Sequence, residues 1–218
     1  MSGTIRRFVC ALAALSLLFA LNAHPGWGQG TAPAPAKVAA TKMALRDLYV
    51  NHLFWVRSLV VATRLGQAAM ASEADEYGMR NAAAIGQSIA PFYGEAAARK
   101  FTTLFTGHYS AVKAYMRAAF GNSYRGNAAA KKAALAQLTR NAQDIAAFVS
   151  GANPNLPKAT VYGLLLTHGQ QHVMAIEATA KRAWGDEADM WDPMVKHIYT
   201  LSDALVDGIA KQFPDKFQ

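Results

Sequence analysis

Apolar residues recur at three- and four-residue spacing along most of the chain, which is the period of an amphipathic helix. In the first such segment, about residues 41–65, the apolar stripe consists of Leu45, Leu48, His52, Trp55, Val56, Leu59 and Ala62. Similar stripes over about 67–90, 95–120, 127–151, 157–184 and 192–213 predict five further helices. No segment combines β-branched alternation with hairpin turn signals. We therefore predict an all-α fold, a helical bundle of about six helices.

Turn-forming residues separate these segments. Gly66 ends the first helix, and the sequence Pro-Phe-Tyr-Gly at 91–94 interrupts the pattern before the third. Asn127 is well placed to cap the fourth helix. Pro157 suits the first turn of the fifth helix, and Pro193 suits the first turn of the sixth, because a first-turn residue needs no amide hydrogen.

The first 37 residues differ in character from the rest. Arg6 and Arg7 precede an apolar run over 8–20, as in a secretory signal peptide, and we expect cleavage near Ala23. The run is too short for a membrane anchor, which needs about 20 apolar residues. Residues 24–37 are rich in Pro, Gly and Ala and predict a linker, and 38–218 a single domain. The expected location is periplasmic or secreted, with no stable membrane span after cleavage.

Cysteine content and charge exclude several classes of function. Cys10 is the only cysteine and lies within the predicted signal peptide, so the mature protein would have neither disulfides nor thiolate chemistry. The net charge is +8, and removal of Arg6 and Arg7 leaves +6. The basic residues are scattered singly or in pairs, whereas a nucleic-acid-binding protein needs a dense basic stripe with interleaved aromatic residues. We therefore expect no nucleic-acid partner.

Two parts of the chain resemble each other at an offset of 60 residues. Arg80-Asn81-Ala82 corresponds to Arg140-Asn141-Ala142, and the same offset aligns Ile85 with Ile145, Leu104 with Leu164, and His108 with His168. A matched spacing that spans two helices suggests a duplicated helical hairpin.

Histidines lie on the apolar faces of four predicted helices: His52, His108, the pair His168 and His172, and His197. A single core histidine is usually paired with a neighbouring polar group. Leaving several of them unpaired would cost about 1–3 kcal/mol each. We therefore predict that these five histidines line a core site for a metal ion or small ligand. The alternative is a structural or partner-binding module whose core histidines bond to Asn or Asp residues, with no cofactor.

The ligand chemistry limits the metal. A nitrogen-rich set without thiolate suits copper or zinc, with non-covalent haem as the second choice. We expect Asn81, Asn141, Asp144 and Trp55 in the surroundings of the site. His24 would become the first mature residue after cleavage at Ala23, and its amine and ring could then chelate copper.

Motifs for an enzyme are missing. The Glu-x-x-His pair of di-iron bundles and the His-Glu-x-x-His motif of zinc proteases do not occur. The segment around Ser88 lacks the last glycine of a hydrolase elbow and falls within a predicted helix. The sequence therefore favours a binding protein over an enzyme.

Several short motifs resemble an uncharacterised family of small bacterial helical proteins that is common in spore-forming bacteria. They are the segments 52–57 (HLFWVR), 91–94 (PFYG), 141–145 (NAQDI), 153–154 (NP) and 212–217 (QFPDKF), together with His108 and His168. The resemblance spans about residues 45–217 and implies the helical fold and the histidine positions. Members are sometimes named glycosyltransferase, but no sugar-nucleotide fold is visible here. Members often carry Asp where this chain has Ala84.

Overall fold

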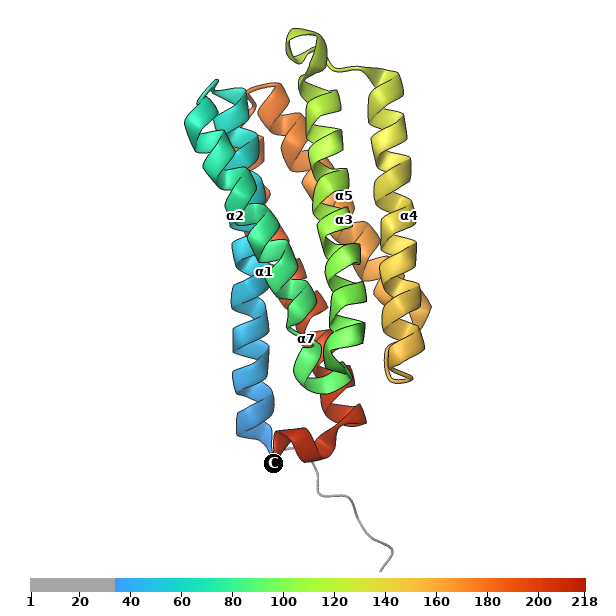
Figure 1. Ribbon diagram of the computed structural model, residues 1–218. Coiled ribbons are helices and arrows are strands. Elements are labelled where there is room, and N and C mark those ends of the chain that lie inside the picture. The colour runs from blue at the N-terminus through green and yellow to red at the C-terminus, as the bar shows by residue number, and fades with distance from the viewer. Residues whose placement is uncertain (1–33) are drawn as a thin grey trace, which may run out of the picture.

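The computed structural model describes residues 34–218. The predictions for the signal peptide, its cleavage site, Cys10 and His24 concern residues outside that range. Within it the protein is an all-α bundle of six long helices, with one short helix and a C-terminal 3-10 turn and no strand (Figure 1). The predicted fold class is therefore confirmed.

The helices follow one another with short connections. They are α1 (Pro35–Arg64), α2 (Ala68–Gln87), α3 (Ala90–Tyr124), α4 (Ala128–Ala152), α5 (Lys158–Ala180), α6 (Trp184–Asp189) and α7 (Trp191–Gln212), followed by η1 (Pro214–Phe217). Short loops between long helices favour antiparallel neighbours.

The bundle has an approximate threefold arrangement of helix pairs. Helices α1, α3 and α5 run in one direction, and α2, α4 and α7 run in the opposite direction (Figure 1). Each of the latter packs against two of the former: α2 against α1 and α3, α4 against α3 and α5, and α7 against α5 and α1. We call α1, α3 and α5 the inner helices and α2, α4 and α7 the outer helices.

Most predicted helix boundaries are close to the observed ones, and the exceptions have local causes. Asn127 caps α4 as predicted, accepting a hydrogen bond from the Ala130 amide at 2.9 Å. Helix α1 begins at Pro35, inside the predicted linker, and α3 begins at Ala90 because Pro91 is tolerated in the first turn. Helix α5 ends at Ala180 rather than near 184, and the chain turns through Arg182 at φ 57° into the short helix α6.

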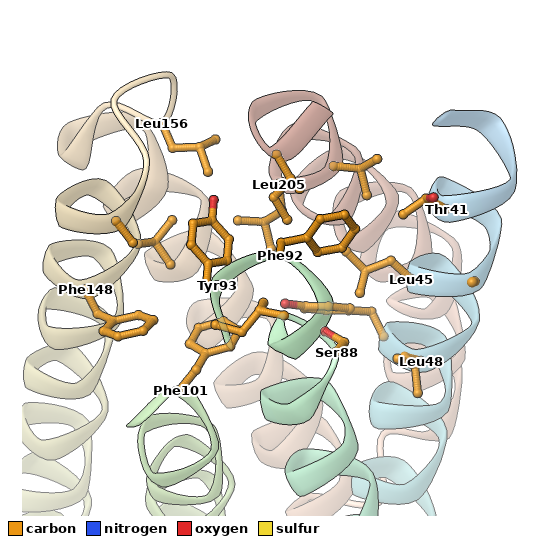
Figure 2. A pocket seen from close by; sticks show the side chains of 17 residues that line it. Thr41, Leu45, Leu48, Ser88, Phe92, Tyr93, Phe101, Phe148, Leu156 and Leu205 are labelled. Atoms are coloured by element: carbon orange, nitrogen blue, oxygen red, sulfur yellow. The ribbon is translucent and has the colours of Figure 1, made fainter. Parts of the chain in front are cut away.

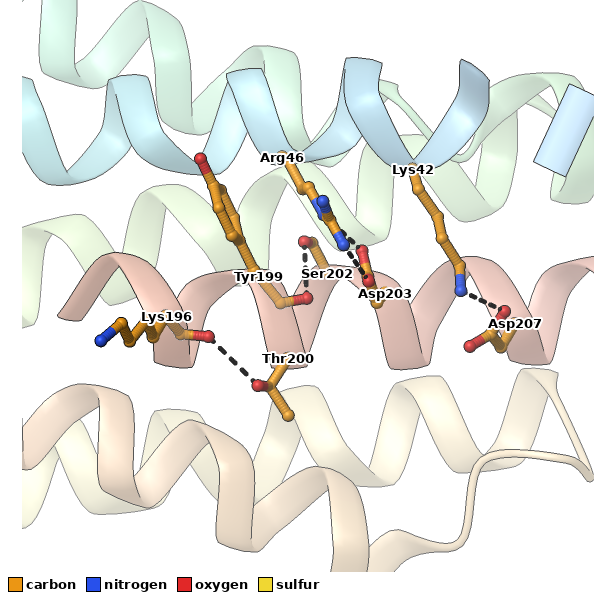
Figure 3. A network of polar contacts seen from close by, with 8 residues as sticks. All are labelled: Lys42, Arg46, Lys196, Tyr199, Thr200, Ser202, Asp203 and Asp207. Carbon is orange, nitrogen blue, oxygen red and sulfur yellow. Dashed lines mark hydrogen bonds and ion pairs between the residues drawn. The ribbon is translucent and has the colours of Figure 1, made fainter. Parts of the chain in front are cut away.

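Ion pairs join the first and last long helices along one side of the bundle (Figure 3). Arg46 donates from Nε to Asp203 at 2.8 Å, and Lys42 lies 2.7 Å from Asp207. The guanidinium of Arg46 also lies over the Tyr199 ring, 4.7 Å from its centroid. These contacts hold α1 and α7 in register.

The apolar core is divided into two parts along the bundle axis. On α1, residues up to Leu53 belong to the larger part and residues from Val56 onward to the smaller part. On α3 the division falls between Phe105 and Tyr109. The layer between the two parts contains the core histidines.

Candidate metal centre

Four histidines from the three inner helices meet in this layer. His52 lies on α1, His108 on α3, and His168 and His172 on α5. All four are buried, with exposed fractions of 0%, 2%, 4% and 2%. Each offers a ring nitrogen, and these four atoms all lie within 4.8 Å of one another. We call this group the four-histidine cluster.

The rings surround a common centre. Nε2 of His168 lies 3.1 Å from Nε2 of His172. The ring centroids of His52 and His108 are 5.9 Å apart, and that of His168 lies 5.8 Å from the first and 5.4 Å from the second. Convergence of nitrogen atoms from three separate helices is the geometry that a single ion requires.

The apolar stripes bring the histidines to the same level. Tyr49, Phe105 and Leu165 each precede a cluster histidine by three residues, and all three are buried in the larger part of the core. Parallel inner helices with the same apolar spacing therefore point His52, His108 and His168 inward at one height. One turn later the helices differ, because α1 has Val56 and α3 has Val112 where α5 has His172.

Five of the eight cluster nitrogens lack the hydrogen bonds that buried polar atoms normally have. Both ring nitrogens of His52, both of His108 and Nδ1 of His168 are buried with no partner within residues 34–218. An unmade hydrogen bond of a buried group costs about 1–3 kcal/mol. Five such atoms in one layer of a well-packed bundle indicate that the layer is built to interact with something other than the protein.

Burial also keeps the imidazoles neutral. Desolvation, with a further contribution from His108, lowers the pKa of His52 to about 3. Desolvation lowers the pKa of His108 to about 4, although Asn141 opposes the shift. The pKa values of His168 and His172 lie well below 6.5 for the same reason, and neighbouring imidazoles add to the effect. At neutral pH all four rings are unprotonated, which is the form that ligates metals.

Each outer helix contributes one side chain that supports the inner helix next to it. Asn81 donates from Nδ2 to the Leu48 carbonyl, and Asn141 donates to the Leu104 carbonyl, both at 2.9 Å. In the third pair, Nε2 of His197 lies 2.9 Å from the Leu164 carbonyl. Leu48, Leu104 and Leu164 each precede a cluster histidine by four residues. The supporting contacts therefore follow the threefold arrangement of the helices.

The remaining residues predicted for the site lie outside the cluster. His197 is half-buried and bonds to a backbone carbonyl, so it supports α5 rather than joining the four rings. Asp144 is exposed. Trp55 stacks on Tyr77, with centroids 4.8 Å apart. Asn81 and Asn141 do lie against the inner helices, and the side-chain oxygen of each is buried without a partner among the described residues.

Two features of the site had not been found in the sequence. The third supporting contact was missed because a histidine on α7 takes the place of the asparagine on α2 and α4. The sequence spacing could have revealed this contact. Asn81 follows Leu48 by 33 residues, Asn141 follows Leu104 by 37, and His197 follows Leu164 by 33. The second is a cavity of about 20 Å³ beside His172, which Arg57 and Glu187 also line.

Comparison with known protein families, with curated proteins and with solved structures gave no match. None of the helices within 34–218 is long and apolar enough to cross a membrane.

Proposed function

We propose that this protein binds one transition-metal ion, copper or zinc, in the four-histidine cluster. The observation that carries the proposal is the convergence of four buried, neutral imidazoles, in which five of the eight ring nitrogens lack a partner among the described residues. Neutral imidazole is a preferred ligand of both metals. The alternative of hydrogen-bonded core histidines would require a partner for each ring, and His197 alone among the five has a backbone carbonyl as its partner.

The spacing of the ligand atoms suits a small coordination sphere. Zinc–nitrogen bonds of about 2.0–2.1 Å in a tetrahedron hold the nitrogens about 3.3 Å apart. His168 and His172 are already at 3.1 Å, and the widest separation in the cluster is no more than 4.8 Å. The nitrogens would have to approach one another by no more than about 1.5 Å to reach this spacing.

Four protein ligands in a buried layer favour a site that holds a metal ion over a catalytic metal site. Catalytic zinc sites keep one position for water or substrate, whereas four protein ligands complete a tetrahedron. The cavity beside His172 is about 20 Å³, enough for one water molecule. A porphyrin would not fit in that space, so the geometry favours a metal ion over haem.

Metal analysis of the purified protein tests this proposal. We expect one copper or zinc per chain by elemental analysis after loading and removal of loosely bound ions. His108→Ala and His168→Ala should lose the metal, while the matched variant His197→Ala should keep it. Circular dichroism establishes that each variant is folded. A folded wild-type protein that retains neither metal, or His108→Ala with full metal content, would contradict the proposal.

We also propose that the protein is exported before it binds metal. The support is the sequence of residues 1–23, with two arginines followed by an apolar run. N-terminal sequencing of the protein from the cell envelope or medium should give a terminus at or after His24. A mature protein that still begins at residue 1 in the cytoplasm would contradict export and leave the metal proposal unaffected.

A further inference from the structure

A separate apolar cavity lies at the end of the bundle where the described chain begins and ends. It has a volume of about 140 Å³ and is lined by residues of α1, α3, α4 and α7, of the turn between α2 and α3, and of the connection between α4 and α5. Figure 2 shows the rings of Phe92, Tyr93, Phe101 and Phe148 around it, together with Leu205. A cavity of about 150 Å³ lined by apolar residues is large enough for benzene.

Most polar groups in the wall of this cavity already have partners within the protein. The Tyr93 hydroxyl donates to Gln212 at 2.8 Å and accepts from Asn153 at 2.8 Å. The hydroxyls of Ser88 and Thr41 donate to the carbonyls of Ile85 and Lys37. These three side chains contribute shape to the cavity and offer little hydrogen-bonding capacity to a ligand.

Tyr49 is the exception. Its ring lines the cavity and is 2% exposed, and its hydroxyl makes no hydrogen bond to any residue in the described range. The ring packs edge-on against Phe105, with centroids 5.7 Å apart, which fixes its position. The oxygen of Tyr49 is not among the fully enclosed polar atoms that lack a partner, so it keeps some accessible surface. A tyrosine hydroxyl in an apolar wall usually finds a hydrogen-bond partner. Of the four hydroxyl groups in this wall, that of Tyr49 is therefore the one free to bond to a ligand in the cavity.

We propose that this cavity binds a compact aromatic ligand with one hydrogen-bonding group, of the size and polarity of phenol, and that Tyr49 provides the hydrogen bond. The volume limits the ligand to about one ring. The aromatic wall favours a planar apolar body, and the single free hydroxyl favours one polar substituent. The site is distinct from the four-histidine cluster and does not depend on a bound metal.

Titration calorimetry with phenol and toluene tests this proposal, because the two molecules have nearly the same shape and differ in the hydroxyl. We expect both to bind the wild-type protein at one site, phenol more tightly. Tyr49→Phe should weaken phenol binding about fivefold, the factor for one net hydrogen bond, and leave toluene binding unchanged. Measurements with and without a chelator should agree.

Two further variants control the experiment. Tyr93→Phe removes a hydroxyl that is already bonded within the protein, so it should leave the ratio of phenol to toluene affinity unchanged. Ala152→Phe places a ring at the cavity wall and should abolish binding of both probes. If Ala152→Phe does not fold, Tyr49→Phe decides alone, since it removes a single oxygen atom.

Three results would overturn the proposal. One is the absence of binding of either probe at millimolar concentration. Another is an unchanged ratio of affinities in Tyr49→Phe. The third is tighter binding of a long-chain alcohol such as 1-decanol than of phenol, which would show that the cavity opens to accept an extended chain.

Discussion

Asn141 donates from its side-chain amide to the Leu104 carbonyl at 2.9 Å, and this bond leaves its oxygen Oδ1 buried without a partner among the described residues. The same side chain raises the pKa of His108 against the effect of burial. Metal-ligating histidines usually donate their second ring nitrogen to such an acceptor, which fixes the tautomer and the ring orientation. The bond to Leu104 therefore orients Asn141 as a positioning residue for His108.

Replacement of Asn141 by Leu should weaken metal binding without removing a ligand. We expect the dissociation constant to rise by about 10- to 100-fold, the usual effect of losing an outer partner of a metal-binding histidine. Competition with a chromophoric chelator measures it. Ser202→Ala, which removes another buried hydrogen bond to a carbonyl on α7, is the matched control and should retain wild-type affinity. Equal losses in the two variants would reduce Asn141 to a structural role.

Replacement of a cluster histidine by an apolar residue should have opposite effects on the metal-free and metal-bound proteins. His52 has two buried nitrogens without partners, so His52→Leu in the presence of a chelator should raise the free energy of unfolding by about 1–3 kcal/mol. With metal present the same variant should be less stable than the wild type, because binding to the folded state is lost. Urea unfolding with and without metal measures both. Loss of stability in both conditions would show that His52 is a structural residue.

The metal-free protein should lose stability as the pH falls below 6.5. His52 and His108 have folded-state pKa values of about 3 and about 4, below the unfolded value of 6.5. Between pH 6.5 and these folded-state values the unfolded chain binds more protons than the folded protein. The contribution of the two histidines to the free energy of unfolding is therefore complete above pH 6.5 and is lost progressively down to about pH 3–4. Within this range each histidine should lower the free energy of unfolding by about 1.4 kcal/mol for each unit by which the pH falls.

Urea unfolding of the chelator-treated protein at pH 7 and pH 5 checks this prediction. Between pH 7 and pH 5 the two histidines together should lower the free energy of unfolding by about 4 kcal/mol. The double variant His52→Leu/His108→Leu should have a clearly flatter profile. A wild-type profile that is already flat between pH 7 and pH 5 would show that these rings are exposed to solvent or already protonated.

The sequence was sufficient to predict the helices and the faces of the histidines, but not how those faces meet. Apolar spacing on one helix determines that His52 or His108 points inward, because that depends on local periodicity alone. Whether four rings converge or remain separate depends on the relative height and direction of three helices, which the pattern does not contain. Asp144 shows the same limit, since its place beside the apolar face did not reveal that it is exposed.

The short helix α6 and the apolar cavity could not be predicted for a related reason. Arg182 adopts a left-handed backbone conformation, which is usually found at glycine or asparagine, so the residue type does not predict the turn. The cavity arises from incomplete packing of four helices and two connections, and its lining residues look like ordinary core positions in the sequence. A void depends on how several helices pack together, whereas an apolar stripe can be read from the sequence of a single helix.

The close approach of α2 to α3 should make Gly86 intolerant of substitution. A methyl group on Gly86 would lie 2.3 Å from the Cα atom of Thr102, so the backbones would have to separate. We expect Gly86→Ala to destabilise the protein by about 2–3 kcal/mol, in the range of overpacked core sites, although alanine favours the helix. Gly163→Ala on α5, where the added methyl meets no atom within 4 Å, is the matched control and should be neutral or stabilising. Thermal unfolding compares the two variants.

The Arg57–Glu187 ion pair should control how fast metal exchanges with solvent. Glu187 on α6 is 5% exposed and receives two hydrogen bonds from Arg57, at 2.6 and 2.8 Å. Both residues line the small cavity that reaches His172, so this pair closes the side of the bundle next to the cluster. We expect metal to exchange through a local opening of α6, whose free energy would depend on this contact.

Glu187→Gln weakens the ion pair while preserving the shape of the side chain. If the free energy that favours the closed position of α6 falls by about 1.4 kcal/mol, the population of the open state rises about tenfold. Metal transfer to an excess of chelator should then accelerate by about that factor. The amount of bound metal at saturation should not change. Glu76→Gln removes an exposed ion pair with Arg80 and is the matched control. Equal transfer rates in the wild type and Glu187→Gln would place the route of exchange elsewhere in the bundle.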